Sequence, residues 1–183
     1  MKKYLITSPE FYTGTPTIFA EKLEVQIQKH QPDFVLFRDK ETVDYHSLAT
    51  AFMAVLNQHP SIKAFLHEDF KLAKELNARG IHLSGESFSK IREAKKQNLE
   101  VIVSTHTYDE VLNVEKLGVD YVTYSPIFDT PNKGEPKGVR DLTELLALTK
   151  IKIFALGGIV SDEQINLIEK TEAYGFASIR YFY

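Results

Sequence analysis

Short apolar runs alternate with longer amphipathic segments along almost the whole chain. Each short run has the length and the β-branched or aromatic character of a buried strand. The predicted strands are 4–7, 34–37, 64–67, 80–83, 101–104, 121–124, 153–156 and 176–179. The segments between them have helical periodicity, and the clearest predicted helices are 19–28, 45–57, 70–78, 108–117 and 162–169.

Start and stop signals support several of these helices. Thr107 with Glu110, and Ser161 with Gln164, have the spacing of a capping box, in which side chain and backbone satisfy each other's free donors. Gly118 stands where a helix should end before the next strand.

The order of these elements predicts the fold class. Strands covered by helices on both faces read as continuous apolar runs, and most of these runs do. A strand–helix rhythm repeated about eight times favours a parallel sheet closed into a (β/α)8, or TIM, barrel. An open doubly wound sheet is the alternative, but no dinucleotide-binding fingerprint follows the first strand. We therefore expect a compact α/β barrel over residues 1–183 as a single domain.

The last predicted strand is followed by too few residues for an eighth helix, so we expect the barrel to lack its final helix. The aromatic segment Arg180-Tyr181-Phe182-Tyr183 follows that strand. Either neighbouring helices cover its outer side or another subunit does, because large exposed apolar patches usually mark an interface. We favour a homodimer.

Composition narrows the class of partner. The net charge is -3 and the basic residues are scattered, which argues against nucleic acid or an anionic membrane surface as the main partner. The chain has no cysteine, so disulfides and thiolate metal sites are excluded and a cytoplasmic location is expected. No apolar run is long enough to span a bilayer.

Polar residues follow several predicted strands, where barrels of this kind build their active sites. Arg38 and Lys40 follow the second strand and suit a phosphate or pyrophosphate, although a solvated charged turn is the alternative. Glu68 and Asp69 follow the third strand. They could hold Mg²⁺ through carboxylate oxygens, or serve as acids in the first turn of a helix.

The later strands add further candidates. Ser104 and His106 end the fifth strand with a hydroxyl and an imidazole, and Lys133 lies in the long loop 125–138, which is typical of a lid or binding loop. Gly157 and Gly158 follow the seventh strand, where backbone N–H groups can approach a phosphate closely. For the loop 125–138 the alternative is a flexible connection without a binding role. For the glycine pair it is a tight turn without a ligand.

Two more residues complete the set. Ser178, at the end of the eighth strand, would add a hydroxyl to a phosphate site. His82 lies inside the fourth strand, which favours a packed, hydrogen-bonded histidine over a catalytic one.

These same residues give the chain a resemblance to the thiamine phosphate synthase and TenI superfamily over nearly its whole length. The matching stretches are YLIT at 4–7, FRDK at 37–40, GIHL at 80–83, VSTH at 103–106, SPIFDT at 125–130, LGGI at 156–159 and GFA at 175–177. Each stretch is weak alone, but their order and spacing are specific.

The synthases of this superfamily join an aminopyrimidine pyrophosphate to a thiazole phosphate and release pyrophosphate, with Mg²⁺ present. The resemblance implies small phosphorylated substrates and assigns roles to residues of this chain. The implied catalytic residues are Arg38, Lys40, Ser104 and Lys133, and the implied substrate-binding residues are Thr130, Gly157, Gly158, Ser178 and His106.

The chain departs from the synthase pattern at the metal. The Asn-Asp pair of the family is His67-Glu68 here, and the second magnesium aspartate falls at Ser87, with Glu86 beside it. The resemblance therefore implies Mg²⁺ at Glu68 and Glu86.

Three functions follow from the resemblance. The first, which we favour, is a synthase-like enzyme that diverges at the metal. The second is the TenI reaction, tautomerisation of a thiazole carboxylate phosphate. The catalytic histidine of that branch aligns with Pro126, so His106 or His67 would have to act as a relocated base. The third is a non-catalytic protein that binds a thiamine precursor.

Overall fold

The computed structural model describes residues 1–12, 14–39 and 42–183, and its eight parallel strands form a closed barrel in sequence order. The strands are β1 (Lys2–Ile6), β2 (Phe34–Phe37), β3 (Lys63–His67), β4 (Gly80–Leu83), β5 (Glu100–Thr105), β6 (Tyr121–Tyr124), β7 (Lys152–Leu156) and β8 (Gly175–Ser178). Pairing of β1 with β8 closes the sheet. The predicted (β/α)8 barrel is confirmed.

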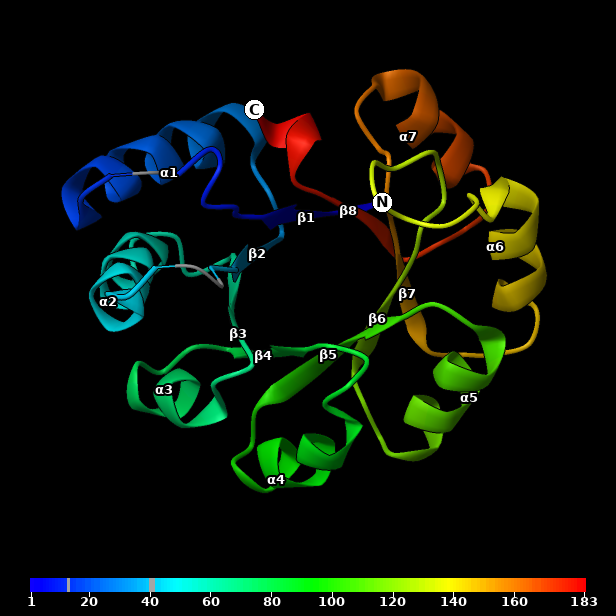
Figure 1. Ribbon diagram of the computed structural model, residues 1–183, viewed down its shortest axis with the longest axis horizontal. Helices are drawn as coiled ribbons and strands as arrows, with labels where there is room; N and C mark the ends of the chain where they lie inside the picture. The colour runs from blue at the N-terminus through cyan, green and yellow to red at the C-terminus, as the bar shows by residue number, and fades with distance from the viewer. Residues whose placement is uncertain (13, 40–41) are drawn as a thin grey trace.

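In the described part of the chain, seven α-helices surround the barrel as a ring (Figure 1). They are α1 (Pro16–His30), α2 (Tyr45–Leu56), α3 (Phe70–Glu75), α4 (Ile91–Lys96), α5 (Tyr108–Lys116), α6 (Gly138–Leu146) and α7 (Asp162–Glu169). Two short 3-10 turns, η1 (Phe88–Lys90) and η2 (Arg180–Phe182), complete the elements. The predicted lack of a final helix is confirmed, because η2 follows β8. No helix of the described residues is long and apolar enough to cross a membrane.

The predicted helix signals are present as hydrogen bonds. Thr107 and Glu110 form a capping box at the start of α5, and Ser161 and Gln164 form another at α7. Gly118 has a φ of 77°, the left-handed conformation expected just after a helix.

Aromatic side chains fill the barrel interior. The buried interior residues are Tyr4, Ile6, Phe34, Leu36, Phe65, Ile102, Tyr121, Phe154 and Ala177. Two glycines make room for this layer: a Cβ on Gly80 would meet the Phe65 ring at 2.5 Å, and one on Gly175 would meet the Phe154 ring at 2.7 Å. Both would also run into a backbone carbonyl of the neighbouring strand. The interior is therefore a packed core with no channel through it.

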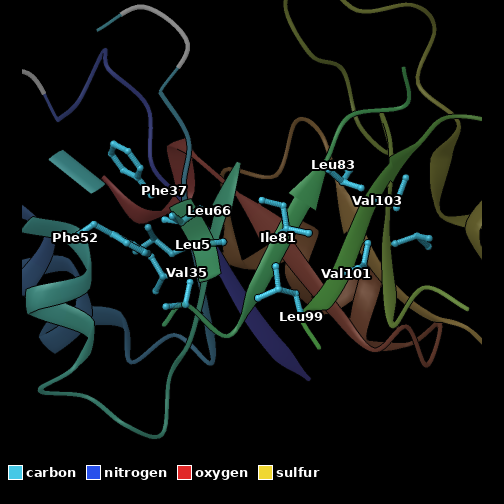
Figure 2. Packing of buried hydrophobic residues seen from close by; sticks show 14 of the residues in the cluster. Leu5, Val35, Phe37, Phe52, Leu66, Ile81, Leu83, Leu99, Val101 and Val103 are labelled. Carbon is cyan, nitrogen blue, oxygen red and sulfur yellow. The ribbon is translucent and has the colours of Figure 1, made fainter. Parts of the chain in front are cut away.

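The outward faces of the strands pack against the helices. Figure 2 shows Leu5 of β1, Val35 of β2 and Ile81 of β4, with Phe52 of α2 directed towards the strands. Each of these four side chains is completely buried. Because both faces of the strands are covered, the middle of most strands is apolar without alternation.

The aromatic segment after β8 is covered by the chain itself. The η2 turn lies between α1 and α7 in Figure 1, and the Phe182 side chain is completely buried. The Phe182 ring meets His30 of α1 edge-on at 5.2 Å, and Tyr183 stacks on Phe11 at 4.4 Å. Neighbouring elements of the same chain thus cover the outer side of β8, as one of the two predicted alternatives requires. The homodimer stays a prediction.

A cluster of ion-paired residues lies at the amino ends of the strands. Glu100 lies between Lys63, whose Nζ is 2.9 Å from its Oε2, and Arg79. Lys63 also donates to the Tyr121 hydroxyl at 2.8 Å. Burial raises the pKa of Glu100, but the two cations outweigh it and hold that pKa below its usual value. Both cations are therefore engaged in ion pairs within the fold.

Candidate active site

The mouth of the barrel lies at the carboxyl ends of the strands. Arg38 stands there, directly after β2, and its backbone N–H donates to Thr7 Oγ1 at 2.9 Å. Thr7 follows β1, and its own N–H donates to the Leu36 carbonyl at 3.0 Å. These two bonds fix the start of the segment that carries Arg38. The predicted catalytic residue Lys40 lies outside the described residues.

A hydrogen-bonded chain of three side chains connects the barrel interior with the mouth. The Tyr4 hydroxyl is 2.8 Å from His82 Nδ1, and His82 Nε2 is 2.9 Å from Ser104 Oγ. Tyr4 is completely buried and His82 is 3% exposed, whereas Ser104 is half-buried at the rim. The prediction of a packed, hydrogen-bonded His82 is confirmed, and its ring fixes the position of the Ser104 hydroxyl.

The His82 ring is neutral at ordinary pH. Burial lowers the pKa of His82 to about 3, and the positive charges of His67 and Arg38 act in the same direction. The Glu68 charge acts in the opposite direction. His67 and Glu68 lie beside His82: the His67 and His82 rings are 6.3 Å apart, and the Glu68 N–H donates to the His82 carbonyl at 3.1 Å.

Glu68 is held by donors from the next strand–helix connection. Its Oε1 accepts from the Ser84 N–H at 2.6 Å, and its Oε2 accepts from Ser87 Oγ at 2.7 Å and from Lys90 Nζ at 2.9 Å. Burial raises the pKa of Glu68, but the Ser84 N–H, the Lys90 ammonium and the hydroxyls outweigh it and lower the pKa to about 2. Glu68 is therefore ionised and accepts hydrogen bonds at both carboxylate oxygens.

These contacts do not fit the magnesium site implied for Glu68 and Glu86. Mg²⁺ needs oxygen ligands with lone pairs directed at it, and Lys90 and Ser87 already approach Glu68. Glu86 is exposed, and Asp69 instead caps α3 by accepting from the Leu72 N–H at 2.9 Å. Within the described residues, no group of three acidic or histidine side chains could hold a metal ion.

The long loop after β6 packs directly on the glycine pair after β7. The Phe128 N–H donates to the Gly157 carbonyl at 3.0 Å. A Cβ on Gly157 would lie 2.7 Å from Pro126 Cα and 3.2 Å from Thr130 Oγ1. Both glycines have a positive φ, 99° at Gly157 and 70° at Gly158. The structure thus brings Thr130 and the glycine pair together, and the glycines also serve the docking of the loop.

Two other predicted residues have different surroundings. Lys133 is exposed near the tip of the loop, and its N–H donates to the Thr130 carbonyl at 3.1 Å. Ser178 is buried; its Oγ donates to the Ile159 carbonyl at 2.8 Å and accepts from the Tyr181 N–H at 3.2 Å. Ser178 therefore anchors the segment that follows the glycine pair.

His106 is exposed at the rim of the mouth. Its Nδ1 is 3.1 Å from the Ser125 carbonyl oxygen, which can only accept, so Nδ1 donates. In the neutral ring Nε2 is then the basic nitrogen. Ser125 directly precedes Pro126, the position at which the resemblance places the tautomerase histidine.

The sequence analysis did not single out Lys90, whose Nζ lies 2.9 Å from Glu68 Oε2. Ser87 and Lys90 are three residues apart, and side chains three apart lie on the same side of a 3-10 turn such as η1. That spacing is the one signal in the sequence that could have placed both beside the same partner.

The fold and the rim define a (β/α)8 barrel whose polar side chains gather where active sites of this fold lie. A family model described as thiamine monophosphate synthase matches residues 3–182. The chain belongs to the thiamine monophosphate synthase family.

Individual relatives agree with this assignment. A protein of Aquifex aeolicus named for thiamine-phosphate synthase is 32% identical over 184 residues, which cover 98% of this chain and 96% of that protein. The thiamine-phosphate synthase of Lactococcus lactis subsp. lactis is 33% identical over 177 residues, 91% of this chain and 82% of the relative. A solved thiamine phosphate pyrophosphorylase from Pyrococcus furiosus shares the fold, with a TM-score of 0.82 and 22% identity over 97% of this chain and 85% of that one.

Proposed function

We propose that the chain is a transferase that joins an aminopyrimidine pyrophosphate to a thiazole phosphate, forming thiamine phosphate and releasing pyrophosphate. Family membership over residues 3–182 supports the reaction. The Tyr4–His82–Ser104 chain is the structural observation that supports it most, because it holds a hydroxyl in place at the mouth, at the same end of the barrel as Arg38, whose N–H is bound to Thr7.

The reaction sets a clear task for the protein. The bond between the pyrimidine methylene carbon and the pyrophosphate oxygen breaks, the electron pair leaves with pyrophosphate, and the thiazole nitrogen attacks the resulting cation. Catalysis is then mainly positioning and charge stabilisation. Arg38, with Lys40 and Lys133, would bind the departing pyrophosphate as charge-assisted donors, and Ser104 would donate a hydrogen bond to it.

The thiazole phosphate would bind on the other side of the mouth. The close approach of Thr130 to Gly157 supports a phosphate site made of backbone N–H groups of Gly157 and Gly158 and of the Thr130 hydroxyl. This hydroxyl donates to the Phe128 carbonyl at 2.9 Å and would turn from it to the phosphate. Ser178 would act through Ile159, whose carbonyl it holds, and would not touch the phosphate itself. No step is assigned to magnesium, because the surroundings of Glu68 do not fit it.

A product assay tests this proposal. Purified protein is incubated with both substrates, with and without Mg²⁺, and thiamine phosphate is measured by chromatography. We expect product, and a loss of roughly a hundredfold or more in rate for Arg38→Met. Arg140→Met is the matched control, since Arg140 is 93% exposed on α6 and pairs with Glu144. No product above a heat-denatured control under either condition would refute the proposal.

Tautomerisation of a thiazole carboxylate phosphate is the second candidate, and His106 supports it. The bond from Nδ1 to Ser125 leaves Nε2 as a base next to the position implied by the resemblance. If this is the reaction, the isomerised thiazole will form with the wild-type protein and not with His106→Ala. An active His106→Ala variant would exclude His106 as the base.

A further inference from the structure

The ion pair between Lys90 and Glu68 occupies the part of the mouth where the sequence implied a magnesium ion. Lys90 ends η1, and its Nζ lies 2.9 Å from Glu68 Oε2. Ser87 Oγ donates to the same carboxylate oxygen at 2.7 Å. The carboxylate thus holds a cation supplied by the chain itself.

The Lys90 ammonium has the capacity to bind a second anion. An ammonium group carries three N–H donors, and the bond to Glu68 uses one of them. The Lys90 side chain is 44% exposed and the Glu68 side chain 25% exposed, so the pair is accessible from the solvent. A compact ammonium is a common phosphate ligand, and here its partner removes much of its conformational freedom before any ligand arrives.

The pair belongs to the same mouth as Arg38. Glu68 follows β3, the neighbour of β2, and Ser84, which donates to Glu68, follows β4. The Glu68 N–H donates to the His82 carbonyl at 3.1 Å, and the His82 ring is hydrogen-bonded to Ser104 at 2.9 Å. An anion bound by Ser104 would therefore lie on the side of the mouth that carries Glu68 and its partner Lys90.

We infer that Lys90 is a substrate-binding cation that contacts the pyrophosphate group of the aminopyrimidine substrate, with Glu68 as its positioning residue in place of a metal ligand. This inference rests on the proposed function for the identity of the substrate. It adds that the pyrophosphate group binds without a divalent metal, because the cation beside it is covalently part of the chain.

Calorimetric titration of the full chain with inorganic pyrophosphate tests the inference, once in EDTA and once with Mg²⁺. We expect binding in EDTA, with a Kd within about threefold of the value with Mg²⁺. Lys90→Met should weaken binding in EDTA by about tenfold, and Lys90→Arg should restore most of it. Lys95→Met is the matched control. Like Lys90, Lys95 follows β4, is partly exposed (35%) and is paired with a carboxylate, Asp120, at 2.7 Å. Unlike Glu68, Asp120 accepts from the Val101 N–H near the opposite end of the barrel.

The outcomes separate this inference from the proposed function. Binding that requires Mg²⁺, no binding under either condition, or equal affinity of wild type and a folded Lys90→Met would each overturn it. Circular dichroism checks folding, and Lys90→Gln, which can still donate to Glu68, replaces Lys90→Met if that variant unfolds. If thiamine phosphate forms with Mg²⁺ and not in EDTA, the proposed function stands while this inference fails.

Discussion

Glu68→Gln changes one group whose ionisation is coupled to the stability of the fold. In the wild type the carboxylate accepts from a backbone N–H, a hydroxyl and an ammonium. The glutamine keeps the shape and one acceptor oxygen, but it has no charge for Lys90. The variant should therefore be less stable than the wild type at neutral pH, and the difference should depend on pH.

The size of the effect follows from the pKa of Glu68. The pKa of Glu68 falls from 4.5 to about 2 on folding. Without solvent screening, this difference corresponds to about 3 kcal/mol of stability. The side chain is 25% exposed, so solvent screening reduces the expected contribution to roughly 1–2 kcal/mol. Because the folded pKa is depressed, this stability is present above pH 4.5 and is lost as the pH falls towards 2.

Urea unfolding followed by circular dichroism at several pH values between 7 and 2.5 measures this difference; the chain has no tryptophan for fluorescence. The free energies of unfolding of wild type and Glu68→Gln should converge below pH 4.5. Glu86→Gln is the control, since Glu86 is exposed in the neighbouring loop and should leave the stability unchanged. A constant gap between wild type and Glu68→Gln across this range would refute the reasoning.

Four further predictions follow from the packing and the mouth. Gly80→Ala places a Cβ against the Glu100 carbonyl and the Phe65 ring, so urea unfolding should show a loss of about 3 kcal/mol; an unchanged midpoint would contradict this. Phe182→Ala removes a completely buried ring and should cost about 3–5 kcal/mol, seen as a lower Tm by calorimetry. Ser104→Ala should lower kcat in the product assay roughly a hundredfold, and an unchanged kcat would remove Ser104 from the proposed reaction. The NMR resonances of His82 should not titrate between pH 8 and 5, because its pKa is about 3; a midpoint near 6.5 would show that the ring is not buried as described.

The sequence predicted the fold well because the barrel imposes a simple pattern. Strands with helices on one face and the aromatic interior on the other are mostly apolar on both faces, so 34–37, 80–83 and 121–124 stand out although His82 and Thr123 lie within them. The helix α6 was not among the clear segments. It begins at Gly138, where the Pro- and Gly-rich loop ends, and glycine in a first helical turn resembles a continuing loop.

The site was less predictable because side-chain direction is a property of three dimensions. Glu68 and Lys90 are 22 residues apart in the chain, and their contact depends on where η1 begins. The sequence offered a phosphate-binding turn or a tight turn without a ligand for the glycine pair, and neither interpretation included Pro126, which packs on it from another loop. Strand ends show which loops share the mouth, but they do not show which polar groups there already have partners.

The Tyr4–His82–Ser104 chain has a consequence for what the mouth accepts. A neutral imidazole donates from one nitrogen and accepts at the other, so the three groups can be ordered in either of two senses. If Tyr4 donates to His82 and His82 donates to Ser104, the serine proton is free to point outward. A ligand that offers lone pairs favours this sense, because it accepts the serine proton. The buried tyrosine thereby takes part in making the mouth a donor towards anions.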